Sequence, residues 1–492
     1  MRGPEEGSKA HANSRNPGNV QHGLGMTPEM MLDLARKAAE LVVERIENLP
    51  RGDAWDGDFR ETLEHKLMVD PPEHGRPGVE VLEEAARDIL PYAMRLDHPK
   101  CFAFVPSAPT WPGVLADFMA AGFNINECTW LVASGASQVE LVVLEWFRQW
   151  LGYPDGAGGL LTSGGSAASV DAFVAAREAA GSPDRATVYM SDQSHSAFVR
   201  AAMIVGVRRD CIRMIPCDER FRLDMAALTA AVAEDRAAGC NPIAICANAG
   251  ATATGAVDPL VAMADYCAAE GIWLHVDAAY GGFAVITGEG RELLRGIERA
   301  DSVGLDAHKW LFQPYEAGCL LVKDVRTLEE PFGVRPDFLQ DTVWGANHPN
   351  FTDRGLQLSR SFRALKIWMS IQTFGMAAFR QAVAQGMEFA ARAEDYVRAS
   401  PVLEILNPAS LGVIVFRFNP ADAGLGEESL EAINQRVLTG IFWEDNAFIS
   451  SARPKGTFAL RLCIINHNTT WDDVRETLEA IERFGAEALS AE

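Results

Sequence analysis

The chain has 492 residues, of which 48% are hydrophobic and 23% charged, a composition typical of a globular protein with large buried cores. Its formal net charge of −23 argues against nucleic acid and anionic membranes as partners, because both are negatively charged. No apolar run reaches the roughly 18 residues that a membrane span needs. The nine cysteines form no C-x-x-C pair and lie mostly in apolar segments, which is typical of reduced thiols in the cytoplasm.

The N-terminal segment, residues 1–25, is rich in Gly, Asn, Ser and Pro and shows no hydrophobic periodicity. It also lacks the apolar stretch of a signal peptide. We therefore expect a disordered tail and a cytoplasmic protein.

The first predicted helix begins at Thr27-Pro28, a favourable pair for an N-cap and a first helical position. Its apolar positions fall on one face, and the helix is predicted to end near Pro50. Such a helix lies outside the pattern that follows, so we expect its apolar face to pack on another domain or a second subunit.

Residues 110–385 alternate helical stretches with short apolar strands, predicted at 187–190, 242–247, 272–276, 302–305 and 319–322. This alternation favours an α/β domain with a parallel sheet covered on both faces. In such sheets the ligand lies beyond the carboxyl ends of the strands.

Residues 386–492 follow a different pattern. Strands are predicted at 413–418 and 458–464, followed by a helix that Thr470 caps with Asp473 at its third position. We expect a smaller C-terminal α+β domain here.

A glycine-rich turn, Ser163-Gly164-Gly165-Ser166-Ala167, lies between an apolar pair and a helix-like run. Free backbone N–H groups at the start of a helix favour a phosphate. A tight connection without a ligand is the simpler interpretation of the turn by itself. The chain has no G-K-[ST] continuation, so a P-loop is not supported.

His195 follows a predicted strand, and either a capping histidine or an imidazole stacked on an aromatic cofactor is consistent with that place. Ala279 could lie under the opposite face of such a cofactor, since it shares a side of its strand with Asp277. Thr252 lies in a loop where hydroxyl groups mostly bond to nearby backbone, so its position alone indicates no role.

Asp277 and Lys309 each come just past a predicted buried strand. A lysine amine that holds pyridoxal phosphate (PLP) as a Schiff base, with a carboxylate that keeps the pyridine nitrogen protonated, needs this combination. A solvated surface lysine is the ordinary alternative. The apolar neighbours of Lys309 argue against it and predict that desolvation lowers the pKa of its amine.

From about residue 27 to its end, the chain resembles the group II PLP-dependent amino-acid decarboxylases, which include the aromatic L-amino-acid decarboxylases. Ordered motifs carry the resemblance: His98-Pro99 with Phe102-Ala103-Phe104, Ser163 to Ser166, Asp192 to His195, Gly250 to Thr252, Ile272 to Tyr280, Asp306 to Leu311, and Arg360 to Lys366.

The resemblance implies a PLP enzyme of fold type I, like aspartate aminotransferase, with a large domain at 110–385 around a mostly parallel, seven-stranded sheet and a small C-terminal α+β domain at 386–492. It also implies a homodimer with a shared active site, in which the helical segment 26–109 is a dimerisation arm. Each cofactor contact falls on a residue of this chain: Lys309 as the Schiff-base lysine, Asp277 at the pyridine nitrogen, His195 and Ala279 on the two ring faces, Gly165, Ser166 and His308 at the phosphate, and Thr252 near a ring substituent.

Two positions depart from the family pattern. Asp306 stands where some members have Asn, and because a carboxylate beside a phosphate is unfavourable, we expect Asp306 to point away or to accept backbone N–H bonds. Phe338 stands where aromatic decarboxylases carry the loop tyrosine that protonates Cα. A phenyl ring has no proton to donate.

Members with Phe at this position include plant aldehyde synthases, in which O2 oxidises the decarboxylated intermediate to an aldehyde, ammonia and hydrogen peroxide. The resemblance thus leaves open a decarboxylase, with water, His195 or another group as proton source, and an aldehyde synthase.

The predicted substrate pocket is smaller and more polar than in catechol- or indole-binding members, and favours an aromatic or medium-sized apolar amino acid. Its residues are Leu96, Phe104, Val105, Pro106, Asn126 and Cys128. An aminotransferase or a weakly catalytic PLP-binding protein is the more distant alternative.

Overall fold

The computed structural model describes residues 23–333 and 348–491, and the chain divides into two compact units between Met94 and Arg95. The first unit holds three helices: α1 (Pro28–Asn48), α2 (Arg60–Leu67) and α3 (Gly78–Asp88), with α1 packed along α3. Thr27 caps α1 as predicted, because its hydroxyl accepts a hydrogen bond from the Met30 amide at 3.3 Å. Most of the tail predicted for residues 1–25 lies outside the described residues.

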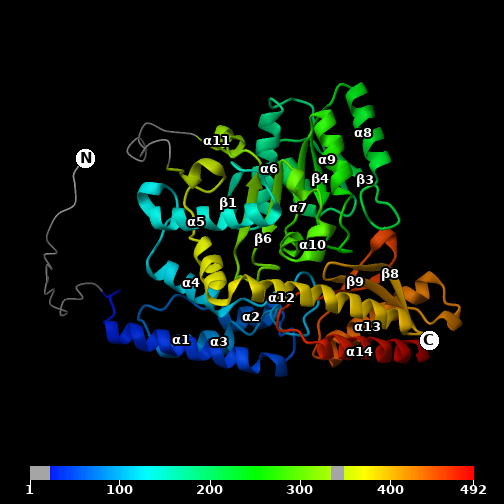
Figure 1. Ribbon diagram of the computed structural model, residues 1–492. Coiled ribbons are helices and arrows are strands. Elements are labelled where there is room, and N and C mark those ends of the chain that lie inside the picture. Colours follow the sequence, from blue (N-terminus) through cyan, green and yellow to red (C-terminus); the bar gives the residue numbers. More distant parts are fainter. Residues whose placement is uncertain (1–22, 334–347, 492) are drawn as a thin grey trace, which may run out of the picture. The chain divides into compact units, whose positions relative to one another are not determined.

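The second unit contains a seven-stranded sheet in the order β1-β7-β6-β5-β4-β2-β3 (Figure 1). Its strands are β1 (Gly158–Thr162), β2 (Ala186–Ser191), β3 (Ile212–Ile215), β4 (Asn241–Asn248), β5 (Trp273–Asp277), β6 (Ser302–Asp306) and β7 (Gly318–Val322). Only β7 runs against the others, since it pairs antiparallel with both β6 and β1. Six strands therefore end at one edge of the sheet.

The five strands predicted for this region are confirmed as β2, β4, β5, β6 and β7. The prediction missed β1, whose apolar run is short, and β3, which is only partly buried. The apolar runs gave no direction for β7, because a fully buried strand reads as an apolar run whichever way it points. The mostly parallel, seven-stranded sheet that the resemblance implies is confirmed.

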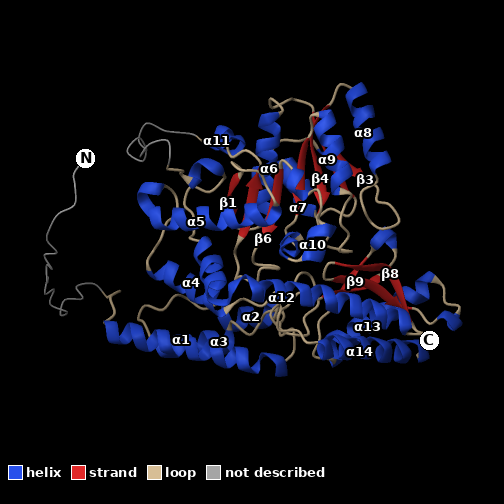
Figure 2. Cartoon of the chain, viewed as in Figure 1, coloured by secondary structure: helices blue, strands red, loops and turns tan. Residues whose placement is uncertain are grey.

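Eight helices precede the long α12 in this unit, and several pack directly on the large sheet (Figure 2). They are α4 (Trp111–Gly122), α5 (Trp130–Leu151), α6 (Gly165–Ala179), α7 (Ser196–Ile204), α8 (Met225–Ala237), α9 (Leu260–Glu270), α10 (Gly288–Leu293) and α11 (Arg326–Phe332). Helix α6 contacts five of the strands, and its buried face consists largely of alanine. Small side chains bring the start of α6 close to the strand ends.

A second, antiparallel sheet in the order β10-β11-β9-β8 follows later in the chain. It consists of β8 (Leu403–Ser410), β9 (Val413–Phe418), β10 (Ser450–Ala452) and β11 (Ala459–Cys463), with α13 (Glu427–Glu444) and α14 (Trp471–Ser490). The capping box of Thr470 and Asp473 at the start of α14 is confirmed. Helix α12 (Ala364–Ala399), yellow in Figure 1, contacts both α4 and β8 and so connects the helices that precede it with the second sheet.

Among residues 23–333 and 348–491, no helix combines the length and the apolar character that crossing a membrane requires.

Candidate active site

The site lies at the sheet edge where the parallel strands end. Asp277 is the last residue of β5 and Asp306 the last of β6, and Lys309 follows Asp306 in the next turn. The Gly164-Gly165 turn joins β1 to α6 at the same edge. Strand direction alone therefore brings together residues that lie far apart in the chain.

A cavity of about 480 Å³ opens at this edge. All eight residues predicted to contact a cofactor line it, namely Gly165, Ser166, His195, Thr252, Asp277, Ala279, His308 and Lys309. A volume of this size accommodates a cofactor-sized ligand.

Lys309 is held by a carboxylate. Its Nζ lies 2.9 Å from Oδ2 of Asp306, and its side chain retains 25% of its exposure. Burial lowers the pKa of Lys309, but the negative charges of Asp306 and Asp277 outweigh burial, so the pKa lies above its ordinary value of 10.5. The prediction that apolar neighbours lower the pKa of Lys309 was therefore wrong. It failed because the sequence does not show how close the carboxylates of Asp306 and Asp277 lie to the Lys309 amine.

Asp277 is the second carboxylate of the cavity. Its Oδ1 accepts a hydrogen bond from the Ala279 amide at 3.1 Å. Burial raises the pKa of Asp277, and the positive charge of Lys309 acts in the opposite direction. Two carboxylates and one ammonium leave an excess negative charge, which favours a protonated ring nitrogen at this place.

His195 caps a helix and also lines the cavity. Its Nδ1 accepts a hydrogen bond from the Ala197 amide at 3.2 Å and caps α7. The same ring lines the cavity. Because Nδ1 accepts, the hydrogen of the neutral imidazole lies on Nε2.

The glycine turn leaves the start of α6 open for an anion. No side chain caps this helix, and Gly164 has a φ of 155°, which favours glycine. A Cβ at Gly165 would lie 3.2 Å from Oδ2 of Asp306 and 3.4 Å from Cβ of Ala279. The turn therefore presents backbone N–H groups at close range, as a phosphate requires.

Asp306 points into the site, contrary to expectation. Its side chain is 3% exposed, its Oδ2 contacts Lys309, and the same Oδ2 lies 3.6 Å from Nε2 of His308. None of the described backbone amides bonds to its Oδ1, which has no hydrogen-bond partner there. The expectation failed because the end of β6 directs this side chain toward the glycine turn.

His308 is oriented by the strand beside it. The Ala317 amide donates to its Nδ1 at 3.1 Å, and the ring lies 4.6 Å from that of Tyr315. Burial lowers the pKa of His308, although the Asp306 carboxylate acts to raise it. A neutral ring that accepts at Nδ1 can donate from Nε2 into the cavity.

The predicted substrate residues do not gather at this cavity. Of the described lining, none belongs to the set Leu96, Phe104, Val105, Pro106, Asn126 and Cys128. Phe104 is 58% exposed, and the amide oxygen of Asn126 accepts a hydrogen bond from the Arg360 amide. Phe338 lies outside the described residues.

Several lining residues had no predicted role, among them Ser163, Tyr280, Tyr315 and Glu316. Tyr280 stacks on Trp310 at 5.4 Å, and its hydroxyl accepts from the Gly412 amide at 2.7 Å. Tyr280 stood in a quoted motif, three residues after Asp277, and that place was the signal that could have found it. Tyr315 and Glu316 carried no signal beyond closeness to Lys309 in the chain.

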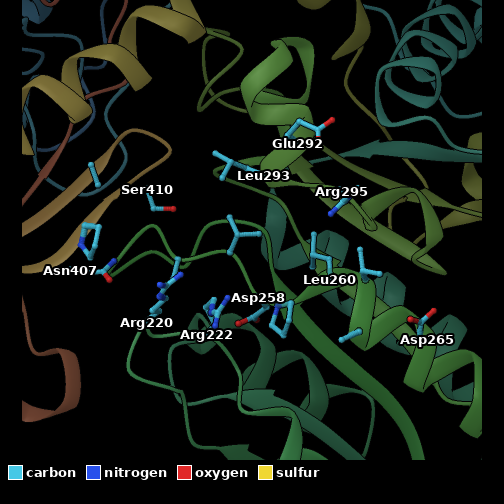
Figure 3. A pocket seen from close by; sticks show the side chains of 17 residues that line it. Arg220, Arg222, Asp258, Leu260, Asp265, Glu292, Leu293, Arg295, Asn407 and Ser410 are labelled. Carbon is cyan, nitrogen blue, oxygen red and sulfur yellow. The ribbon is translucent and has the colours of Figure 1, made fainter.

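A larger cavity of about 780 Å³ lies elsewhere in the second unit (Figure 3). Its lining contains no lysine. Asp258 there accepts hydrogen bonds from Leu223 and Asn248, and Arg222 is paired with Asp218 at 2.7 Å. Two of its charged groups, Asp258 and Arg222, are thus engaged by the fold, and the eight predicted cofactor residues line the smaller cavity instead.

The residues that line the smaller cavity suit one cofactor in particular. Lys309 offers an amine to an aldehyde, Asp277 a carboxylate to a protonated ring nitrogen, and the open start of α6 its N–H groups to a phosphate. These features fit pyridoxal phosphate.

Comparison with known proteins agrees. Residues 61–419 match the pyridoxal-dependent decarboxylase conserved domain. The chain belongs to the PLP-dependent decarboxylase family. It is therefore a PLP-dependent carboxy-lyase, as its motifs indicated.

Individual relatives span nearly the whole chain. It is 37% identical to an aromatic-L-amino-acid decarboxylase of Bacillus atrophaeus, covering 95% of this chain and 98% of that protein. It is 31% identical to a phenylacetaldehyde synthase of Arabidopsis thaliana, covering 85% and 88%. The crystal structure of TDC from Oryza sativa with PLP and tryptamine superposes with a TM-score of 0.89 at 28% identity, covering 95% of this chain and 99% of that one. The expected fold type I architecture is thereby confirmed.

Proposed function

We propose that this PLP-dependent decarboxylase acts on an aromatic L-amino acid, as a cytoplasmic homodimer, with Lys309 as its Schiff-base lysine. The observation that carries the proposal is the placement of Lys309 and Asp277 in one cavity at adjacent strand ends, beside the open start of α6. The relatives named above support the aromatic substrate class.

Each side chain has a definite task. When bound, PLP supplies an electron sink for the pair that remains on Cα as CO2 departs. Asp277 holds a proton at the ring nitrogen, while His195 and Ala279 confine the two ring faces and Thr252 lies beside a ring substituent. The remaining phosphate contacts are Gly165, Ser166 and His308.

An exposed apolar surface on α4 and α5 supports the homodimer. Phe118 is 64% exposed, Phe123 75%, Leu131 45% and Val132 57%. Several large apolar side chains exposed within one short stretch of chain are typical of an interaction site. Asn126 and Cys128 lie in the same stretch of chain, so a partner subunit here would complete the substrate pocket predicted from Leu96, Phe104, Val105, Pro106, Asn126 and Cys128.

An aldehyde synthase is the second candidate, and Phe338 favours it. Without a phenol at this position, protonation of Cα is slowed and O2 can compete. The balance is one amino acid, one O2 and one water giving aldehyde, CO2, ammonia and hydrogen peroxide. Similarity to the Arabidopsis phenylacetaldehyde synthase supports keeping this alternative.

A product assay tests the function. Full-length enzyme with PLP would receive L-Phe, L-Tyr, L-Trp or L-DOPA under air, with CO2, amine, aldehyde and peroxide measured together. Amine with CO2 identifies a decarboxylase, and aldehyde with equal peroxide identifies a synthase. Keto acid without CO2 would indicate transamination, and no turnover of any of the four would contradict the proposal.

Phe338→Tyr tests the proton source. The restored phenol is expected to shift product toward amine by about a hundredfold, the lower end of the range for a positioned acid. The matched control is Phe338→Leu, which changes shape without adding a proton. Equal amine-to-aldehyde ratios in Phe338→Tyr and wild type would show that Cα obtains its proton elsewhere.

A further inference from the structure

Asp306 is a buried carboxylate with only half of its bonding capacity in use. Its side chain is 3% exposed, and Oδ2 contacts the Lys309 ammonium at 2.9 Å. The other oxygen, Oδ1, has no hydrogen-bond partner among the described residues. A buried carboxylate oxygen without a partner is costly, so its place calls for an explanation.

Both carboxylate oxygens of Asp306 lie near the start of α6. A Cβ built on Gly165 would lie 3.2 Å from Oδ2 and 3.7 Å from Oδ1, and one built on Gly164 would lie 3.9 Å from Oδ1. Helix α6 has no side-chain cap, and its start carries the positive end of the helix dipole. The carboxylate therefore lies between the two positive features of the cavity, the Lys309 amine and the start of α6.

Apart from Lys309, the ionisable groups described around Asp306 supply no positive charge to balance a second anion such as a phosphate. Burial lowers the pKa of His308, so its ring favours the neutral form. Asp277 adds negative charge. Burial raises the pKa of both Tyr315 and Cys319, which are near Asp306, and neither group can carry a positive charge. Lys309 is thus the one cation among the groups described around this carboxylate.

We propose that Asp306 limits how tightly the chain holds PLP, because its carboxylate occupies the same two positive features that the aldehyde and the phosphate must use. When the Schiff base forms, the Lys309 nitrogen replaces the aldehyde oxygen, which leaves as water, and the ammonium releases a proton. Asp306 thereby loses its ammonium partner, and the phosphate adds negative charge beside it. Asp306 is in this sense a positioning residue that weakens phosphate binding. The inference rests on the cofactor site proposed above.

The experiment separates the phosphate from the aldehyde. Full-length wild type and Asp306→Asn, each resolved of cofactor, are titrated with PLP and separately with pyridoxal, which has the aldehyde without the phosphate. Schiff-base absorbance gives the Kd of each. Asp306→Asn keeps the shape of the side chain and removes its charge.

Asp306→Asn is expected to raise the ratio of the pyridoxal Kd to the PLP Kd by about tenfold or more, since charges this close interact strongly in a partly buried site. Loss of the Lys309 counter-ion affects both ligands and cancels in the ratio. The control Asp324→Asn, an exposed carboxylate paired with Arg326, should leave the ratio at the wild-type value. Asp306→Ser serves as a second neutral variant if the asparagine variant does not fold.

An unchanged ratio in the neutral variants would overturn the inference. A lower ratio would also overturn it, because it would mean that Asp306 helps to bind the phosphate. Failure of wild type to form a Schiff base with PLP at all would instead refute the proposed site.

Discussion

Three charged side chains decide the chemistry of the cavity, namely Lys309, Asp277 and Asp306. Burial acts to deprotonate the Lys309 amine, but the negative charges of Asp306 and Asp277 keep it protonated. A Schiff base needs a free amine, so the ammonium must lose its proton as the cofactor binds. The strand ends that carry these residues therefore set both the affinity and the reactivity of the lysine.

Lys309→Ala is expected to abolish the Schiff-base absorbance and the borohydride-fixed cofactor, and to lower kcat by about a thousandfold or more, as loss of a covalent catalyst does. The matched control is Lys323→Ala, whose amine donates to the Arg299 carbonyl at 2.8 Å. Absorbance spectra before and after borohydride, with steady-state kinetics, provide the measurement. A Lys309→Ala enzyme that keeps a reducible adduct would place the Schiff base on another lysine.

At the scale of elements, a buried charge cluster joins α5 to the end of β1. Arg360 donates to Oε1 of Glu140 at 2.6 Å and to the Leu161 carbonyl at 2.8 Å. The Leu161 amide in turn donates to Glu140 at 2.7 Å. Leu161 lies two residues before Ser163, so the cluster positions the strand from which the glycine turn begins.

The other basic residues of the Arg360–Lys366 motif are also used by the fold. Arg363 pairs with Glu316 at 2.5 Å, and Lys366 pairs with Asp117 at 2.8 Å. Both basic side chains are buried. Because Glu316 lines the cavity, Arg363 of this motif contacts the site through that residue.

Glu127 in this cluster predicts a pH dependence of stability. Burial and the nearby Glu140 charge raise the pKa of Glu127, Arg360 acts in the opposite direction, and the result is a pKa of about 10. The carboxyl of the unfolded chain ionises near its ordinary value of 4.5, so the unfolded state binds fewer protons than the folded state between these pH values. Stability contributed by Glu127 is complete below pH 4.5 and is lost as pH rises toward 10.

Glu127→Gln is accordingly expected to stabilise the fold by about 2 kcal/mol or more at pH 8, with a smaller gain at pH 5. Urea unfolding at both pH values measures the change. Glu145→Gln on α5, whose exposed carboxylate pairs with Arg148, is the control and should change stability by less than about 1 kcal/mol. A Glu127→Gln variant less stable than wild type at pH 8 would show that Glu127 is ionised in the fold.

At the scale of the whole molecule, α1 carries apolar side chains that its own unit leaves uncovered. Met31 is 54% exposed, Val42 38%, Val43 42% and Ile46 45%. A helix with such a face is stable when another surface covers it. This agrees with the proposed dimerisation arm at residues 26–109.

The double variant Val43→Glu/Ile46→Glu is expected to raise the dimer Kd by about a hundredfold or more, because charges inside an apolar interface are left without partners. Sedimentation velocity at several concentrations measures it. Activity should fall on dilution in parallel, since the active site is proposed to be shared. Glu44→Gln on the same helix is the control, and an unchanged dimer in the double variant would remove α1 from the interface.

The local sequence was enough to predict much of this protein. Apolar runs located five strands of the large sheet, and Thr27 and Thr470 marked two helix starts, because strand burial and N-capping depend on nearby residues. Ordered motifs predicted the family, and eight cofactor residues that the structure brings to one cavity. The roles of those eight residues, the domain boundaries and the effect of Phe338 on protonation of Cα stay predictions.

Only the tertiary structure decided the direction of β7, the inward turn of Asp306 and the charge balance at Lys309. The reason is physical: electrostatic energies depend on distances between atoms, and spacing along the chain does not set those distances. The Glu140–Arg360 pair shows the same limit, since its partners are 220 residues apart in the chain and 2.6 Å apart in space. Sequence by itself determined which chemical groups the chain brings to its sheet edge, and folding determined how their charges act on one another.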